Sequence, residues 1–255
     1  MRIRLPLYKP IKEVAEDYYN KAKKIKEKIE RAKALLNEEL KKEERKKKEI
    51  KKEWFMKYRF TFTESGFLVI GGKDANQNER IMKVYRKDGD LVFHADIHGA
   101  PFALMLLNNP NADSVEEVIE KYKITETDLM QAAGLSAVYS KAWQEGLASI
   151  DVFYVLGKQI SKKAPSGEYL KHGSFMVYGK KHYIRVPLRL YIVEKEKVYA
   201  VPSIYNGDKY IELIPGDIKK EKIAKKIAEL LNVSEDYIKS LLPSGYFRIT
   251  KIKNI

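Results

Sequence analysis

Apolar residues recur every three or four positions over the first part of the chain, which is the spacing of one face of a helix. No glycine or proline interrupts this stripe after Pro10, and it fades into a lysine- and glutamate-rich run from residue 41. We therefore expect residues 1–53 to form a helical arm of coiled-coil type, either as one helix or as a short hairpin that turns near Asn37. The stripe consists of Ile11, Val14, Tyr18, Ala22, Ile25, Ile29, Ala32, Leu36 and Leu40.

From residue 54 the pattern changes to short strands mixed with helices. Period-two alternation and short apolar runs bounded by turn residues predict strands. They fall at residues 58–63, 67–72, 91–96, 151–157, 174–179, 188–193, 197–201 and 209–214, with the Pro-Gly-Asp run at 215–217 ending the last of them. Helices are expected at residues 74–85, from Thr125 to about Glu145, at 218–231 and at 234–242.

Strands and helices do not alternate regularly along residues 54–255. That order predicts an α+β fold, in which a mixed, mostly antiparallel sheet is covered by packed helices. Two short helices at about residues 218–242 form a C-terminal pair, the second capped by Ser234. Thr125 and Asp128 have the spacing of a capping box. Trp143 is expected to pack in the core.

Composition narrows the class of protein. The chain has 255 residues, is 44% hydrophobic and contains no cysteine. A thiolate metal site, a disulfide framework and a cysteine nucleophile are therefore excluded. No apolar run approaches the roughly 18 residues of a membrane span, and the N-terminus has no continuous apolar segment of signal-peptide type. We expect a cytoplasmic protein without a transmembrane segment.

Positive charge is concentrated in two windows. The whole chain carries a formal net charge of +14, which favours polyanionic partners such as RNA, DNA or an anionic membrane surface. Residues 1–53 have a net charge of +8, and residues 158–190 hold eight basic residues and one acidic residue. The first window is either a solvated helix or an arm that lies against nucleic acid. The second is either a soluble loop or a surface for phosphates.

Two loops carry more polar side chains than a simple turn requires. "IGGKDANQNE" (residues 70–79) joins a strand to a helix, where backbone amides attract phosphate. It is neither a Walker A loop nor a Rossmann fingerprint, and a turn with an Asp or Asn cap is the alternative. "GKQISKKAPSGEYLKHGSF" (residues 157–175) combines four lysines with Tyr169, which suits phosphate contact and base stacking.

"HADIHG" (residues 94–99) ends a predicted strand. If the segment stays extended, His94, Asp96 and His98 point the same way. A metal site would need a fourth ligand, for which His172 and Asp74 are candidates. An acid–base pair would need a cleft. The other two interpretations are a strand end whose polar residues bond to neighbouring loops, with Gly99 permitting the turn, and direct contact with RNA.

Five motifs occur in one order that resembles the NFACT-R domain, the C-terminal RNA-binding module of the NEMF/RqcH family of ribosome-associated quality-control factors. They are "EWFMKYRFTFTESGFLVIGGKDANQNE", "LVFHADIHGAP", "YSKAW", "QISKKAPSGEYLKHGSFMVYGKKHY" and "PGD…LPSG", and they span about residues 54–250. The segment at residues 15–32 also resembles the start of the family's coiled coil, here shortened.

The resemblance implies a binding factor rather than an enzyme, with no cofactor. Family members bind a large ribosomal subunit that carries a stalled nascent chain, and they hold tRNA. The implied partners are therefore the large subunit and its tRNA or rRNA. The resemblance does not extend to the family's N-terminal NFACT module, so the chain is either a fragment or a standalone member that works alone or with a separate polypeptide carrying that module.

Charge and resemblance together select the candidate nucleic-acid-binding residues. Asp74, Gln77, Asn78 and Glu79 match the family's "DAxQNE", and His94, Asp96, His98 and Gly99 match its "HADxHG". Ser161, Lys162, Gly167, Glu168 and Tyr169 match its "QxSKxxxxGEY". The full candidate set is Lys73, Asp74, Asn76, Gln77, Asn78, Arg80, His94, Asp96, His98, Lys158, Ser161, Lys162, Lys163, Glu168, Tyr169, Lys171, Lys180 and Lys181.

Two other functions compete with RNA binding. A metal-dependent nuclease or hydrolase would use His94, Asp96 and His98, and it would cleave tRNA when Mg²⁺, Mn²⁺ or Zn²⁺ is present. A standalone module for DNA or an anionic surface would draw on the same positive charge.

Overall fold

The computed structural model describes residues 8, 10–45, 53–97, 99–163 and 170–255, and for residues 38–45 it describes the backbone alone. The chain divides into two compact units, residues 1–48 and residues 49–255. Among the described residues, no helix has both the length and the apolar character that crossing a membrane requires.

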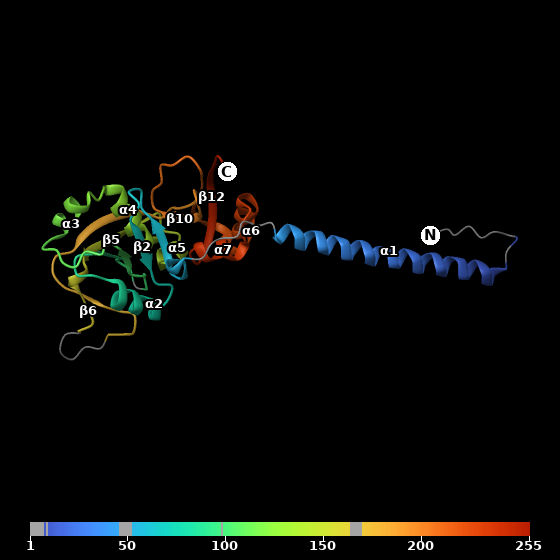
Figure 1. Cartoon of the computed structure of the whole chain (residues 1–255), viewed down its shortest axis with the longest axis horizontal. Coiled ribbons are helices and arrows are strands. Elements are labelled where there is room, and N and C mark those ends of the chain that lie inside the picture. The colour runs from blue at the N-terminus through green and yellow to red at the C-terminus, as the bar shows by residue number, and fades with distance from the viewer. Residues whose placement is uncertain (1–7, 9, 46–52, 98, 164–169) are drawn as a thin grey trace. The chain divides into compact units, whose positions relative to one another are not determined.

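The N-terminal unit contains one long helix, α1 (Ile11–Arg45), drawn in blue in Figure 1. The helix continues without a break through Asn37, so the single-helix alternative is confirmed to Arg45 and the hairpin is wrong. The part of the arm at residues 46–52 lies outside the described residues. Much of the apolar stripe is exposed, including Ile25, Ile29 and Leu36. An exposed apolar stripe on a long helix favours packing against another helix.

A six-stranded sheet forms the centre of the globular unit. Its strand order is β1-β2-β4-β3-β5-β8, and each neighbouring pair is antiparallel. The strands are β1 (Arg59–Phe62), β2 (Leu68–Gly71), β3 (Leu91–Ala95), β4 (Ala103–Met105), β5 (Ser149–Leu156) and β8 (His182–Pro187). The predicted α+β fold with antiparallel strands is confirmed.

Helix α4 (Glu126–Val138) is almost entirely buried because it lies between this sheet and strand β10 (Val198–Pro202). The close approach explains Gly134, where a Cβ would come within 2.9 Å of the Ser203 Cβ. The predicted capping box begins the helix, since Thr125 Oγ1 accepts the Asp128 amide at 3.1 Å and Asp128 accepts the Thr125 amide at 2.9 Å.

A second antiparallel sheet and a helix pair complete the globular unit. The sheet has the order β10-β9-β11-β12, with β9 (Leu190–Glu194), β11 (Tyr210–Lys219) and β12 (Tyr246–Lys253). Helices α6 (Lys220–Leu231) and α7 (Glu235–Leu241) occupy the positions of the predicted C-terminal pair, and Ser234 caps α7 by accepting the Tyr237 amide.

Shorter elements connect these layers. Among them, α2 and the small pair β6–β7 hold the segments that the motif analysis selected (Figure 1). The short elements are a 3₁₀ turn (Trp54–Lys57), α2 (Ala75–Arg80), a π-helical turn (Ile81–Tyr85), α3 (Val115–Tyr122), α5 (Lys141–Gln144), a 3₁₀ turn (Gly157–Gln159), β6 (Ile160–Ser161) and β7 (Met176–Val177).

Two expectations about element boundaries were wrong. The helix expected from Thr125 to about Glu145 breaks at Tyr139, because the Ser140 hydroxyl accepts the Ala142 amide and starts the separate helix α5. The Pro-Gly-Asp run at 215–217 does not end the strands. Strand β11 passes through it to Lys219 with a register shift against β12 between Pro215 and Ile218, so a bulge accommodates the proline.

Candidate nucleic-acid interface

The "DANQNE" loop uses two of its polar side chains to build its own helix start. Asp74 Oδ1 accepts the Gln77 amide at 2.8 Å and caps α2. Gln77 Oε1 accepts the Lys73 amide at 3.1 Å, while its Nε2 donates to the carbonyl of Lys57 at 3.3 Å. The predicted cap is therefore confirmed. Asp74 and Gln77 hold the loop in shape and fix where the neighbouring side chains point.

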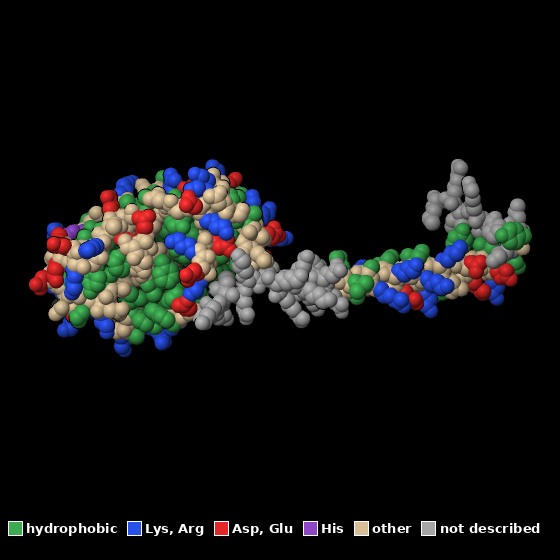
Figure 2. Space-filling model, turned by 45° about the horizontal axis from the view of Figure 1, so that its top comes forward, with side chains coloured by type: hydrophobic (Ala, Val, Ile, Leu, Met, Phe, Trp, Pro, Cys, Tyr) green, Lys and Arg blue, Asp and Glu red, His purple; other side chains and the backbone are tan. Residues whose placement is uncertain are grey.

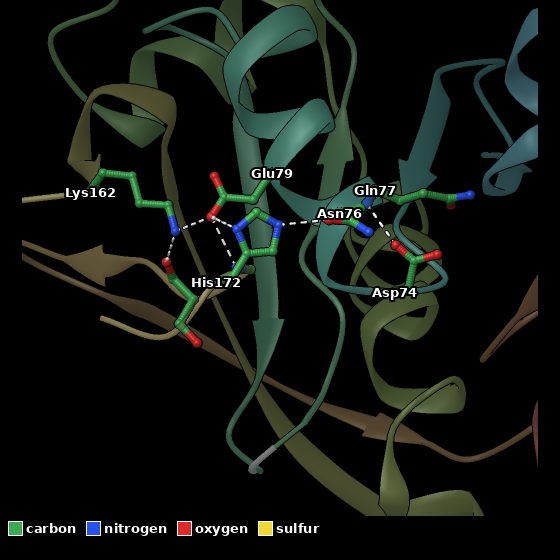
Figure 3. Close-up of polar contacts among 8 residues, drawn as sticks. Asp74, Asn76, Gln77, Glu79, Lys162 and His172 are labelled. Atoms are coloured by element: carbon green, nitrogen blue, oxygen red, sulfur yellow. Dashed lines mark hydrogen bonds and ion pairs between the residues drawn. The ribbon is translucent and has the colours of Figure 1, made fainter. Parts of the chain in front are cut away.

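Glu79 and Asn76 join α2 to the loop at residues 171–175, although almost a hundred residues separate them in sequence. The amide of Gly173 donates to Glu79 Oε1 at 2.9 Å, and His172 Nε2 lies 2.9 Å from Asn76 Oδ1 (Figure 3). The other ring nitrogen of His172 lies 3.5 Å from the Glu79 carboxylate. These contacts bring two of the three motifs together through direct side-chain bonds.

Lys162, which directly follows strand β6, also contacts this junction. Its ammonium forms an ion pair with Glu79 and donates to the carbonyl of Ser174 at 2.7 Å (Figure 3). The ammonium also lies 4.3 Å from the centre of the Phe175 ring. Desolvation alone would raise the pKa of Glu79, but the hydrogen bonds from Lys162 and Gly173 outweigh it and lower that pKa. The carboxylate thus stays ionised and the ion pair persists.

His94 is half-buried and lies against aromatic rings. Its ring lies 4.3 Å from the Phe102 ring and 5.5 Å from the Phe153 ring, measured between centroids. Nε2 lies 3.1 Å from the carbonyl of Ala100, an acceptor, so this nitrogen carries the proton. Burial lowers the pKa of His94 to about 4, although the Ala100 bond and Asp96 act in the opposite direction. The imidazole is therefore neutral at neutral pH, half-buried, and part of the lining of the groove described below.

The extended backbone on which a shared face of His94, Asp96 and His98 depends is not kept through this segment. Strand β3 ends at Ala95, and the Ile97 amide turns back to the Ala95 carbonyl at 2.8 Å. Asp96 follows the strand and is exposed, whereas His94 lies within the strand and is half-buried. Gly99 has a φ of 83° and makes the predicted turn. His98 lies outside the described residues.

The three motifs line one groove of about 470 Å³. Its basic and imidazole side chains come from four parts of the chain, and Asp74 is the acid in its lining. The lining residues are Arg59, Gly72, Lys73, Asp74, Ala75, Asn78, His94, Gly99, Ala100, Pro101, Phe102, Lys171, His172, Gly173, Ser174 and Phe175. Lys171 makes no side-chain hydrogen bond or ion pair within the described part of the chain.

The remaining lysines of the candidate set differ in what they contact. Lys158 donates to the carbonyl of Ala112 at 2.6 Å, and Lys181 lies 4.4 Å above the Phe153 ring centre. Lys180 lies 3.5 Å from Glu116 in an exposed pair. Lys163 is exposed, and its backbone amide donates to the Ser161 hydroxyl at 3.0 Å. On the face that Figure 2 shows, lysine and arginine side chains are spread over the globular unit.

Three candidates, His98, Glu168 and Tyr169, lie outside the described residues. The described candidates that do not line the groove are Asn76, Gln77, Arg80, Asp96, Lys158, Ser161, Lys162, Lys163, Lys180 and Lys181. Arg80 is exposed at the end of α2 and lines a separate hollow with Lys57 and Lys83. Three residues that line the groove were not selected by the motif analysis. Arg59 falls within a predicted strand, and Phe102 and Phe175 were not selected as site residues. Their place beside the groove depends on loop packing that no local pattern records.

Within the described residues, which leave out His98, no group of three or more histidine, aspartate and glutamate side chains could hold an ion. His172 and Asp74, the candidates for a fourth ligand, are engaged by Asn76 and by the Gln77 amide. The acid–base interpretation requires a titrating histidine near neutrality, and the lowered pKa of His94 opposes it.

Comparison with known proteins identifies the class. Residues 54–179 match the family of the NFACT protein RNA binding domain. Residues 54–179 therefore form an NFACT-R RNA-binding domain, as the resemblance predicted, and the chain is homologous to the RqcH and NEMF ribosome quality control factors.

Three relatives illustrate this homology. The archaeal Rqc2 homolog aRqcH of Methanocaldococcus jannaschii is 37% identical over 211 residues, which cover 78% of this chain and 30% of that protein. Ribosome quality control complex subunit NEMF of Homo sapiens and its Drosophila melanogaster homolog are each 37% identical over 131 residues. Those residues cover 51% of this chain and 11% and 12% of the two relatives. The chain thus spans less than a third of the length of these relatives.

Among solved structures, the C-terminal part of the fibronectin/fibrinogen-binding protein from Streptococcus suis is similar, with a TM-score of 0.39 and 20% identity. The match covers 68% of this chain and 74% of that one.

Proposed function

We propose that this protein is an RNA-binding module of a ribosome quality control factor, which engages tRNA, rRNA of the large subunit, or both, when a nascent chain has stalled. The observation that carries the proposal is the groove in which the "DANQNE", "HADIHG" and "KHGSF" segments meet beside Arg59, Lys73 and Lys171. Binding requires no chemical step, so the proposed role is that of a cytoplasmic adaptor without a cofactor.

Physical chemistry supports RNA as the ligand of this groove. Lysine and arginine side chains neutralise backbone phosphates and release counterions. Aromatic and imidazole rings beside them offer surfaces on which an unstacked base can lie. Glu79, Lys162, Asn76 and His172 are bonded to one another, so they position the groove rather than contact RNA. Of the candidate nucleic-acid-binding residues, Lys171 is the one best placed to bind a phosphate.

The arm supports a second contact. Its exposed apolar stripe, with Ile25 and Ile29, suits pairing with another helix, and a separate polypeptide that carries the NFACT N-terminal module is the partner we propose for it. Replacement of Ile25 and Ile29 by Ser should abolish co-purification with such a partner. It should leave RNA binding by residues 49–255 unchanged in the full chain.

A filter-binding titration with labelled tRNA tests the RNA proposal. Affinity should fall steeply as salt is raised, because phosphate contacts release counterions. Lys171→Ala should weaken binding by about fivefold and reduce the salt slope by about one. Lys225→Ala, an exposed lysine on α6, is the matched control and should bind like the wild type. Salt-independent binding, or equal losses in both variants, would contradict the proposal.

Competition experiments separate RNA from the other polyanions. Unlabelled tRNA should displace labelled tRNA at lower concentration than duplex DNA or anionic vesicles do at one salt concentration. Incubation of labelled tRNA with Mg²⁺, Mn²⁺ or Zn²⁺ should leave it intact. Cleavage that His94→Ala abolishes would replace the binding proposal with a nuclease.

A further inference from the structure

Three cationic side chains from distant parts of the sequence are linked through contacts with Tyr139, the end of α7 and the β2–α2 loop. Arg59 begins β1, Lys73 lies between β2 and α2, and Lys220 begins α6. Lys220 is outside the segment that matches the RNA-binding family, which ends at residue 179. A charge from outside that segment therefore lies near Arg59 and Lys73.

Specific contacts hold two of these cations in place. The Arg59 guanidinium lies 4.6 Å above the centre of the Tyr139 ring and donates from Nη1 to the Gly72 carbonyl at 3.3 Å. The Tyr139 hydroxyl donates to the Leu241 carbonyl at 2.5 Å. Lys220 Nζ donates to the next carbonyl, that of Leu242, at 2.8 Å. Arg59 thus packs on the buried Tyr139 ring, and Lys220 bonds to the carbonyl next to the one that Tyr139 contacts at the end of α7.

The charges of this cluster are not neutralised within the described residues, where none of the three cations forms an ion pair with a carboxylate. Burial and the charge of Arg59 lower the pKa of Lys73 and of Lys220. The acids that act on the cluster are Asp74 and Glu221, and Asp74 already caps α2. Three like charges held together cost stability, and an anion that binds among them recovers it.

We propose that Arg59, Lys73 and Lys220 form a phosphate-binding site at the junction of β1, the β2–α2 loop and α6. Arg59 and Lys73 also line the groove that contains Lys171, so the site extends that groove toward α6. Phosphate suits this arrangement because a planar guanidinium and two ammonium groups can each donate to a different oxygen. The extension of the site to an RNA backbone phosphate rests on the proposed function. An inorganic or terminal phosphate has the same chemistry.

Thermal unfolding of the full chain tests the site without RNA. Inorganic phosphate should raise the Tm above that in chloride at equal ionic strength. Lys73→Gln and Lys220→Gln should each raise the Tm in chloride, since repulsion is removed, and should lose the response to phosphate. Glutamine keeps a donor for the Leu242 carbonyl, which guards the Lys220 variant against unfolding. Lys225→Gln is the control and should respond like the wild type.

A titration with a short single-stranded RNA distinguishes the source of the phosphate. If the ligand is an RNA backbone, Lys73→Gln and Lys220→Gln should each weaken binding by about tenfold and lower the salt slope by about 0.7. If they lose the phosphate response but bind RNA normally, the site holds a phosphate that is not part of RNA, while the Lys171 result decides the proposed function separately. A Tm that does not respond to phosphate, or a response that survives Lys73→Gln, overturns the site.

Discussion

The backbone amide of Gly173 donates a hydrogen bond to the carboxylate of Glu79 at 2.9 Å, across 94 residues of chain. Gly173 adopts a φ of 82°, and its Cα lies so close to α2 that an added Cβ would come within 2.7 Å of the Ala75 Cα. The bond and the close approach together fix the groove, because they bring the "KHGSF" segment against the first turn of α2.

Gly173→Ala should destabilise the protein more than the matched change Gly66→Ala. Both glycines have positive φ, so alanine at either position pays about 1 kcal/mol of backbone strain. Only at Gly173 does the new methyl group also meet a neighbouring backbone, since nothing lies within 4 Å of the corresponding position at Gly66. Urea unfolding measures the difference, and tRNA binding should fall in the Gly173 variant alone. Equal losses of stability would show that the contact with α2 is dispensable.

His94 should make the protein less stable as the pH falls from about 6.5 to about 4. Its pKa in the folded state is about 4, below the ordinary value of 6.5, so in this range the unfolded chain binds a proton that the folded chain excludes. The contribution of His94 to the free energy of unfolding is fully present above pH 6.5. About 3 kcal/mol of it is lost by pH 4. Urea unfolding at a series of pH values measures the loss.

The control for this titration is His94→Gln, whose amide can still donate to the Ala100 carbonyl but does not titrate. It should remove most of the slope between pH 6.5 and 4. His172→Gln changes an exposed imidazole and should leave the slope in place. A slope that persists in His94→Gln would assign the pH dependence to other groups.

Glu79 and Lys162 should be coupled in a double-mutant cycle. Glu79→Gln and Lys162→Met should each cost stability, and the double variant should cost less than their sum, by about 0.5–1 kcal/mol. The coupling should shrink at high salt because Lys162 is partly exposed. Urea unfolding of the four proteins measures it. Lys163→Met is the neighbouring control, and additive behaviour of Glu79 with Lys162 would contradict the pairing.

Several local features could be read from the sequence because neighbouring residues cause them. The stripe that begins at Ile11 predicted a helix, since helix periodicity depends only on spacing. The Thr125–Asp128 capping box is a four-residue unit whose donors and acceptors satisfy each other. Trp143 is buried as expected, with 1% of its surface exposed. Five short motifs in one order also sufficed to identify the RNA-binding domain.

Other features depended on contacts that spacing does not encode. The sequence suggested one helix from Thr125 to Glu145, but the Ser140 hydroxyl started a new one. The sequence suggested an extended segment after His94, but strand β3 ends at Ala95 and the Ile97 amide bonds to the Ala95 carbonyl. Strand β12 lacks a strong apolar alternation and was not anticipated, because its pairing with β11 across the α6–α7 helices stabilises it.

By itself, the sequence determined the arm helix, the α+β class, the family and the excess of positive charge, since each follows from composition or from short-range order. Tertiary structure alone decided which polar residues remain available for a ligand. Glu79, Asn76, His172 and Lys162 bond to one another across the fold, whereas Lys171, Arg59, Lys73 and Lys220 form no ion pair with a carboxylate within the described residues. Which polar side chains find partners depends on long-range contacts, because folding, and not separation along the chain, decides which side chains come within hydrogen-bond distance.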